Sequence, residues 1–386
     1  MALDFGFTPE QDEFRMFVRE FARREIAPHV AECDEKEQMP WHAIHKMGEA
    51  GLLGIIAPKA LGGQAHDYFH LGIAVEEIAR VDNSCAMICS MQNTLATLIP
   101  GWGDDTIREV IQGRQLLCIA TSESEAGSDV SNMATSARIE GNEFVINGQK
   151  IHVSLMPGGT IMGVTAKVQQ GDGKQAITFI RVPADAPGVS SILMPEMGVR
   201  SHQLGIVNFK DVRVPVEHVL GGRGQAKAVL YARWNVSRCL SALNALGAAQ
   251  QVMDDTIEFV KKKKVYGQAI GHFQAISFPL IEHATRIESC RLMAYKGLWM
   301  NVRGENAAKV AGMAKWSSIT YSIQAIFDCL QMHGAGGYLK DLGIERRYRD
   351  VIGLTFTGGT INVMKLIVVK EMLGASFMGI SGGGDG

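Results

Sequence analysis

The first stretch of the chain, residues 8 to about 115, repeats its apolar positions at the spacing of amphipathic helices. Near its start, apolar residues recur at about i, i+3 and i+4, through Phe14, Phe17, Val18 and Phe21. Thr8 can cap this helix, and Pro9 suits its first position. Residues 57–67, "APKALGGQAHD", interrupt the pattern with glycine and proline. We therefore predict helices on both sides of a loop.

The second stretch, from about 118 to 225, alternates apolar and polar residues instead. In "SARIEGNEFVINGQKIHVSL", the pairs Gly141–Asn142 and Asn147–Gly148 separate short alternating runs. Such pairs favour tight turns between strands. The spacing predicts a compact β domain of seven or eight strands.

The third stretch, from about 226 to 375, returns to the helical period, and its segments are long. Examples are "NVSRCLSALNALGAAQQVMDDTIEFVKKKK" and "NAAKVAGMAKWSSITYSIQAIFDCLQMHGAG". Long helices with one apolar face build bundles. Small residues such as Ala245 and Gly247 allow two such helices to approach closely.

These patterns predict an α+β fold of three domains. We place an N-terminal helical domain at 1–117, a middle β-barrel domain at 118–225 and a C-terminal four-helix bundle at 226–386. The chain has no strand–GxGxxG–helix unit, so a Rossmann domain is not expected. It has no P-loop and no HExxH motif either.

Composition and charge narrow the function further. The 386 residues include 38 basic and 40 acidic ones, and 46% are hydrophobic, which suffices for a large core. The near-zero net charge gives no reason to expect nucleic acid as a partner. No apolar run approaches the roughly 18 residues of a membrane span. The N-terminus lacks the features of a signal peptide, so we expect a cytoplasmic protein.

The seven cysteines are scattered and mostly lie among apolar residues: Cys33, Cys85, Cys89, Cys118, Cys239, Cys290 and Cys329. This pattern is typical of free thiols in a reducing compartment. Cys85 and Cys89 have a spacing that a metal can use, but no histidine lies near them in the sequence. We predict no metal site.

The segment 356–360, "FTGGT", places two adjacent glycines in the helical third stretch. Glycine inside a helix costs about 1 kcal/mol relative to alanine. Either the backbone turns there, or another group must approach it closely.

Several ordered segments resemble motifs of the acyl-CoA dehydrogenase family over nearly the whole chain. "TSESEAGSDVSNMATSA" resembles T-E-P-x-A-G-S-D, the strongest match, and "VINGQKIHVS" resembles N-G-x-K-x-W-I-T. "PKALGGQAHD", "VYGQAIGHFQAISF" and "LQMHGAGGY" resemble further motifs of the family at its spacing. "RYRDVIGLTFTGGTINVMKLIV" resembles the segment that ends in I-x-E-G-T.

The resemblance implies a three-domain subunit of a homotetramer, a dimer of dimers, that binds FAD without a Rossmann fold. In this family a carboxylate removes a proton from Cα of an acyl-CoA while hydride leaves Cβ for the flavin. An electron-transferring flavoprotein is the usual partner. A base must be placed at the α-proton, and the thioester must be polarised to hold the developing charge.

The resemblance also assigns FAD-binding positions. In the middle domain, Thr121 and Ser122 resemble the positions that hydrogen-bond the flavin ring, and Ser128 resembles one near the pyrophosphate or the CoA chain. Ser154 resembles the residue beside flavin N5, and His152 stands at a tryptophan position. Ile119 is a further cofactor-binding position. Those of the C-terminal domain reach a neighbouring subunit's FAD, the pyrophosphate or the adenosine: Lys263, Tyr266, Gln274, Gln331, Gly334, Thr360 and Asn362. Simpler interpretations remain open, namely a Gly/Ser-rich turn at 121–128, a structural histidine at 152 and a solvated helix end at Lys263.

Substrate contacts implied by the resemblance are Ser128, Asn235, Arg238 and Gly359, with ordinary capping and surface charge as the alternative for Asn235 and Arg238. Gly358 stands where the family has its catalytic glutamate. Some members place that glutamate at the position of Ser237 instead. Neither position holds an acid, so the catalytic base stays unknown.

Three interpretations follow from the missing acid. Another group removes the proton from an unusual, branched or cyclic acyl-CoA, by α,β- or vinylogous dehydrogenation. Cys85, Cys89 and Cys239 are weak candidates for that group, because segment 84–98 has no Asp or Glu. Alternatively the enzyme reduces an enoyl-CoA or eliminates a sulfinate group. Sulfinate binding would need an arginine, and this helix has none after Arg80. Lastly, the chain is a non-catalytic FAD- or CoA-binding partner subunit.

Overall fold

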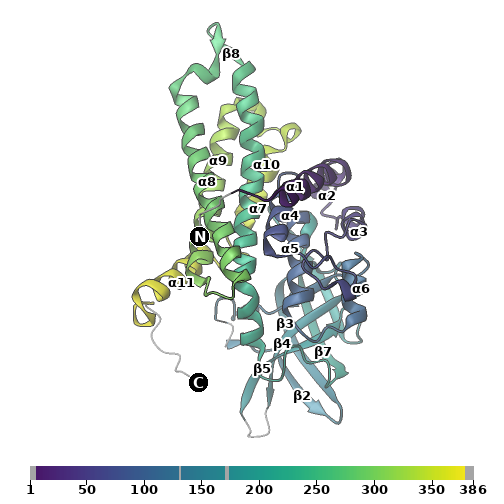
Figure 1. Ribbon diagram of the computed structural model, residues 1–386. Coiled ribbons are helices and arrows are strands. Elements are labelled where there is room, and N and C mark those ends of the chain that lie inside the picture. The colour runs from purple at the N-terminus through teal and green to yellow at the C-terminus, as the bar shows by residue number, and fades with distance from the viewer. Residues whose placement is uncertain (1–5, 130–131, 170–173, 379–386) are drawn as a thin grey trace.

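The computed structural model describes residues 6–129, 132–169 and 174–378. Figure 1 shows three long helices side by side, with the N-terminal helices packed against their middle, the strands β2–β5 and β7 at one end and β8 at the other. The three parts follow the chain in the predicted order, helical, then β, then helical, which confirms the predicted fold class. Among the described residues, no helix has the length and apolarity needed to cross a membrane.

The N-terminal part begins as its sequence predicts. Thr8 caps the first helix by accepting a hydrogen bond from the N–H of Gln11, whose side chain returns the bond. The helix then passes through a π turn at Ala22–Ile26 and a 3₁₀ turn at Ala27–His29. The helices are α1 (Pro9–Phe21), α2 (Val30–Glu35), α3 (Trp41–Glu49), α4 (Tyr68–Ala79), α5 (Asn83–Leu98) and α6 (Asp104–Ile111).

The middle part is a curled sheet of seven strands. Its strands are β1 (Leu117–Ala120), β2 (Ser136–Glu140), β3 (Glu143–Ser154), β4 (Ile161–Gln169), β5 (Gln175–Pro183), β6 (Val189–Met194) and β7 (Leu204–Pro215). Strand β4 pairs with β5 on one side and, in parallel, with β1 and β2 on the other. The order continues through β3 and β7 to β6. Bulges interrupt the pairing of β3 with β7, one of them between Lys150 and Val153.

The C-terminal part is built on α7, α8 and α9, which pack along one another, with α10 and α11 against α9. Its elements are α7 (Ala226–Lys262), the short strands β8 (Lys264–Val265) and β9 (Gln268–Ala269), α8 (Gln274–Val302), α9 (Ala308–Met332), α10 (Ile344–Gly353) and α11 (Ile361–Leu373). Gly247 on α7 has the carbonyl oxygen of Glu76 only 2.2 Å from where a Cβ would lie, so α4 and α7 need a glycine there.

A cluster of ion pairs joins the N-terminal and C-terminal parts. Arg346 on α10 lies 3.2 Å from Asp82 and 3.3 Å from Asp350. Arg349 bonds Asp34 of α2 at 2.7 Å. Burial raises the pKa of the Asp350 carboxyl to about 6. We call these five residues the domain-joining cluster; it fixes α10, which leads into the "FTGGT" segment.

Candidate active site

The segment 356–360, which we call the FTGGT loop, is a turn between α10 and α11. Gly358 has φ of +63° and Gly359 of +96°, a region that side chains rarely adopt. Thr360 then caps α11 by accepting the N–H of Val363. The two glycines therefore serve a backbone turn, the first of the two explanations offered by the sequence.

The space beside Gly358 is open except for one group. Apart from the residues next to it in the chain, a Cβ built at Gly358 would have a single neighbour within 4 Å among the described residues, the Nζ of Lys315 at 3.8 Å. Lys315 lies on α9, is fully buried, and donates hydrogen bonds to the carbonyl oxygens of Thr357 and, at 2.7 Å, of Gly359. Burial, with the nearby charge of Arg238, lowers the pKa of Lys315 to about 7. Sequence reasoning missed this residue.

Ser237, the alternative family position of the catalytic glutamate, is followed by Arg238, whose charge acts on Lys315. The two family positions of the base therefore border the same buried cations. Arg238 is 7% exposed, lies over the ring of Trp234 and donates to Asn235 at 3.0 Å. Its Nε and the hydroxyl of Ser237 are buried without a partner among the described residues. Burial lowers the pKa of Arg238 to about 10.

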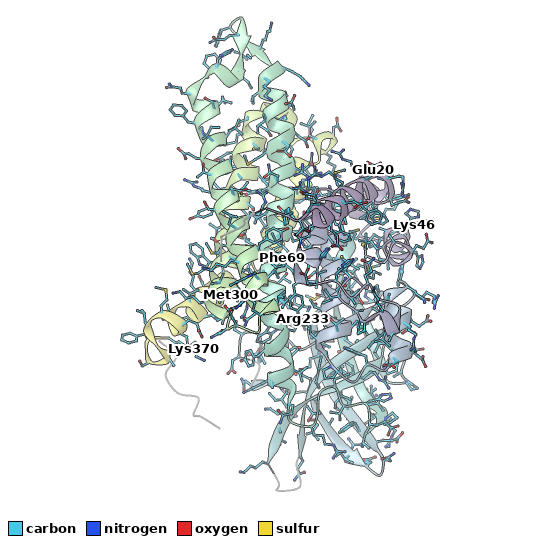
Figure 2. All side chains as sticks on the ribbon, viewed as in Figure 1. Glu20, Lys46, Phe69, Arg233, Met300 and Lys370 are labelled. Carbon is cyan, nitrogen blue, oxygen red and sulfur yellow. The ribbon has the colours of Figure 1, made fainter. Side chains whose placement is uncertain are left out.

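A third buried cation, Arg233, stands one helical turn before Ser237. Its Nε donates to the hydroxyl of Thr94 on α5 at 3.0 Å, and burial lowers its pKa to about 10. Figure 2 places Arg233 on the half of α7 that adjoins the strands. Segment 84–98 has no arginine of its own, but Arg233 of α7 contacts this helix.

The predicted flavin-ring residues of the middle part lie on neighbouring strand ends. The carbonyl of Ser122, just beyond β1, accepts the N–H of Ile151 on β3 at 2.9 Å. Within the part of the chain that the structure describes, the hydroxyl of Thr121 is buried without a hydrogen-bond partner, which suits a position that binds a ligand atom. His152 lies at the β3 bulge with φ of +53°, and its side chain is exposed. It is therefore not a histidine packed in the core.

The other members of this group differ in exposure. Ile119 and Ser154 are partly buried on β1 and β3, and Ser128 is exposed in the segment after β1. One chain thus brings Ile119, Thr121 and Ser122 beside His152 and Ser154.

A buried ion pair braces the segment that follows Thr121. Lys150 is fully buried and bonds Glu123 at 2.8 Å and the carbonyl of Thr121 at 3.1 Å. Burial opposes the charge of Glu123, but hydrogen bonds from Lys150, Thr135 and a backbone N–H outweigh it and lower its pKa to about 2. This pairing holds the predicted flavin-binding turn against the sheet.

A second set of predicted FAD residues lies at the opposite end of the helical bundle. Lys263, Tyr266 and Gln274 are exposed around the β8–β9 hairpin, which Figure 1 shows at the far tip. Gln331 and Gly334, at the end of α9, are exposed as well. A single chain does not bring this set to Thr121. Thr360 is the last residue of the FTGGT loop, and Asn362 follows in the first turn of α11.

The cysteines do not supply a base. Burial raises the pKa of Cys89 and Cys239 to about 12, and it raises that of Cys85 well above its ordinary value. Thiolates are therefore not formed at neutral pH.

Metal-compatible groupings are a separate matter. Within the described residues, the one His/Cys/Asp/Glu group with ligand atoms within 4.8 Å of one another is Glu10, His66 and His70. It contains neither Cys85 nor Cys89.

Comparison with known proteins covers nearly the whole chain. The models of the acyl-CoA dehydrogenase N-terminal, middle and C-terminal domains match residues 8–112, 118–212 and 226–373. The chain is 32% identical to "Probable acyl-CoA dehydrogenase YngJ" of Bacillus subtilis, over 96% of this chain and 100% of that protein. It is 30% identical to "Caffeyl-CoA reductase-Etf complex subunit CarC" of Acetobacterium woodii, over 95% and 99%. The butyryl-CoA dehydrogenase structure of Megasphaera elsdenii superimposes with a TM-score of 0.90 at 26% identity, over 96% and 100%.

Proposed function

The chain belongs to the acyl-CoA dehydrogenase family, and we propose that it is an oxidoreductase of a CoA thioester that works without a carboxylate at either family position of the base. It is an enzyme that acts on CH–CH groups, and its cofactor is FAD. The observation that carries the proposal is that Gly358 and Ser237 supply no acid, in a chain that keeps the predicted flavin-side residues such as Thr121.

The residues present fit FAD. Bound FAD takes a hydride from the acyl chain or returns one to it. Thr121 offers an unpaired buried hydroxyl to the flavin ring, and the Glu123–Lys150 pair holds the turn that carries it. His152 and Ser154 complete this side at the end of β3. We propose that Ile119, Ser122 and Ser128 border the same cofactor, and that Thr360 and Asn362 lie near its adenosine.

On the substrate side, we propose that Asn235, Arg238, Ser128 and Gly359 contact the CoA thioester. The open space beside Gly358 supports a bulky, branched or cyclic acyl group, since only Lys315 lies within 4 Å of the missing side chain. A positioned base contributes roughly 100- to 10,000-fold to proton removal. Oxidation here therefore needs a substrate whose proton is unusually acidic or is removed by solvent.

A specific observation favours the reverse reaction, reduction of an enoyl-CoA, as a second candidate. Lys315, Arg238 and Arg233 are buried cations whose partners among the described residues are backbone carbonyls, an amide and a hydroxyl rather than acids. Adding hydride to Cβ creates negative charge on the thioester, which such cations stabilise. Solvent then supplies the proton to Cα. The similarity to a caffeyl-CoA reductase subunit supports this direction.

Two further alternatives stay open. Arg233 removes the objection that no arginine reaches α5, so elimination of a sulfinate group remains a candidate. The intact flavin-side residues weigh against a non-catalytic partner subunit.

The assembly follows from the exposed second set of FAD residues. We propose a homotetramer, a dimer of dimers, in which Lys263, Tyr266, Gln274, Gln331 and Gly334 reach the FAD of a neighbouring subunit. We propose an electron-transferring flavoprotein as redox partner, as the name of the A. woodii relative suggests for that protein. We retain cytoplasmic location and the domain boundaries at 117 and 225 as proposals.

The test is the absorbance of the flavin in the purified protein under anaerobic conditions. Oxidised protein is titrated with straight, branched and cyclic saturated acyl-CoAs and a 3-sulfinoacyl-CoA. Bleaching by one class establishes a dehydrogenase, and product without bleaching indicates elimination. Chemically reduced protein is then mixed with enoyl-CoAs, and return of the yellow colour establishes a reductase. A protein that cannot be loaded with FAD would overturn the proposal.

A further inference from the structure

Lys315 is the charged group nearest to the position that lacks its carboxylate. The Nζ lies 3.8 Å from the place of a Cβ at Gly358, yet the side chain is fully buried. A buried ammonium normally has an anionic partner. Among the residues that the structure describes, Lys315 has two backbone carbonyls instead, those of Thr357 and Gly359.

Of the described residues, no acid contributes to the charge around Lys315. Segment 354–364, "LTFTGGTINVM", has no titratable side chain. The charge that acts on Lys315 from the helices packed against α9 is that of Arg238 on α7, also a cation. The interior beside the FTGGT loop therefore carries the positive charge of Arg238 and, below a pH of about 7, that of Lys315 as well, and it favours an anionic ligand.

The hydrogen bond from Lys315 also sets the direction of a backbone N–H. In a trans peptide the C=O and N–H point to opposite sides. Because the carbonyl of Thr357 points at Lys315, the N–H of Gly358 points away from α9. Gly358 is exposed, and its N–H has no acceptor among the described residues. The positive φ of both glycines is what lets the carbonyls of Thr357 and Gly359 face the same ammonium.

We propose that Lys315 is a positioning residue of the active site: it turns the N–H of Gly358 toward the thioester oxygen of a bound acyl-CoA, and its charge, together with that of Arg238, stabilises the enolate form of that thioester. The proposal rests on the proposed function, since it takes a CoA thioester as the ligand. Lys315 acts through the loop and through its field, because it is buried beneath the loop and does not touch the substrate.

The chemical step is an ionisation that needs no oxidant. The Cα–H bond breaks, the proton goes to solvent, and the electron pair moves onto the thioester oxygen as an enolate. In the reductive direction the same enolate forms when hydride reaches Cβ, and Cα then takes a proton from solvent. In both directions negative charge develops next to the Gly358 N–H and the two cations, where preorganised donors are most effective.

The test uses acetoacetyl-CoA, a thioester with an acidic Cα, bound to the FAD-loaded protein. ¹³C NMR of the labelled acetoacetyl group reports the pH at which the bound ligand changes from keto to enolate, independently of turnover. Wild type is compared with Lys315→Met, which removes charge and donors, Lys315→Gln, which keeps donors, and Lys315→Arg, which keeps charge. Lys309→Met on the exposed side of α9 is the matched control.

We expect the ligand bound to wild type to ionise at lower pH than free ligand. Removing a nearby charge shifts a pKa by about 1–3 units, so the midpoint rises by about that much in Lys315→Met. Lys315→Gln rises nearly as far, whereas Lys315→Arg and Lys309→Met stay close to wild type. A midpoint that is the same in wild type, Lys315→Met and Lys315→Gln, with the ligand bound, overturns the inference. Wild type that binds no CoA thioester overturns the proposed function instead.

Discussion

The molecule buries cations in two regions, which differ in whether the cations have acidic partners. In the domain-joining cluster, Arg346 lies between the carboxylates of Asp82 and Asp350. Beside the FTGGT loop, Lys315 and Arg238 are as deeply buried, but among the described residues they meet only backbone carbonyls, an amide and an aromatic ring. Helix α10 connects the two regions, because it carries Arg346 of the cluster and precedes the FTGGT loop in the chain.

The difference separates stability from function. A buried ion pair that loses one partner leaves an uncompensated charge, so the cluster holds the domains together. Cations that are buried without an acid lower the stability of the free protein, and such sites are candidates for ligand binding. The absence of a glutamate at Gly358 increases this contrast, because that residue would have placed an acid beside Lys315.

The largest expected effect comes from giving the loop an acid. In Gly358→Glu the carboxylate starts from a Cβ 3.8 Å from the Lys315 Nζ, so the pair stays ionised. We expect removal of the α-proton of butyryl-CoA to rise by about 100-fold or more, less a cost of about 1–2 kcal/mol for a side chain at positive φ. Exchange of that proton in D₂O, followed by NMR, is the measurement.

Gly358→Gln is the control, with a similar size and strain and no base. If both variants exchange the proton equally fast, an added carboxylate is not what the site lacks.

Breaking the cluster tests the other half of the comparison. Arg346→Met leaves Asp82 and Asp350 buried without their cation, and we expect a loss of about 3–5 kcal/mol in the free energy of unfolding. Urea denaturation of the FAD-loaded protein measures it. Arg108→Met, which removes an exposed pair with Asp105, should cost less than about 1 kcal/mol. Equal losses in the two variants would contradict the role given to the cluster.

The pH dependence of stability sharpens the contrast at Lys315. Its pKa falls from 10.5 in the unfolded chain to about 7 in the folded one. Between these values the unfolded state holds the proton and the folded state does not, so this group makes wild type more stable as pH rises through the window. We expect the stability of Lys315→Met relative to wild type to be highest below pH 7 and to decline toward about pH 10.

Urea denaturation of both proteins at about pH 6.5 and about pH 9 checks this difference. A difference that does not change with pH would show that Lys315 titrates as an ordinary lysine.

The smallest expected effect concerns the thiol next to Arg238. Cys239 is fully buried with a pKa of about 12, so it is protonated at neutral pH and cannot act as a base. We expect Cys239→Ala to keep turnover within about two-fold, with a packing cost of about 1 kcal/mol. A loss of two orders of magnitude in turnover, with FAD still bound, would make Cys239 the missing base.

Local patterns predicted much of the fold and little of the charge arrangement. The Thr8 cap and the Gly141–Asn142 turn between β2 and β3 depend on neighbours within a few residues, and the structure has both as expected. The predicted turn at Asn147–Gly148 is wrong, because both residues lie inside β3. Gly148 instead follows a bulge in the pairing with β7, and a Cβ there would lie 2.5 Å from the Thr135 hydroxyl.

The burial and hydrogen bonding of Lys315 and Arg233 could not be predicted, because their partners lie far away in the sequence. Thr357 is 42 residues from Lys315, and Thr94 is 139 residues from Arg233. The available signal was a lysine on an otherwise apolar face, between the buried Ala311 and Ile319 one turn away.

The most direct measurement is the unfolding free energy of Lys315→Met with and without saturating acetoacetyl-CoA, beside wild type and Arg346→Met. The lost hydrogen bonds and the relieved burial of charge offset each other, so without ligand Lys315→Met should stay within about 2 kcal/mol of wild type. Its stabilisation by the ligand should fall by about 1.4 kcal/mol or more, the equivalent of tenfold in affinity. A Lys315→Met protein as unstable as Arg346→Met, with its stabilisation by the ligand intact, would contradict the distinction between the two regions.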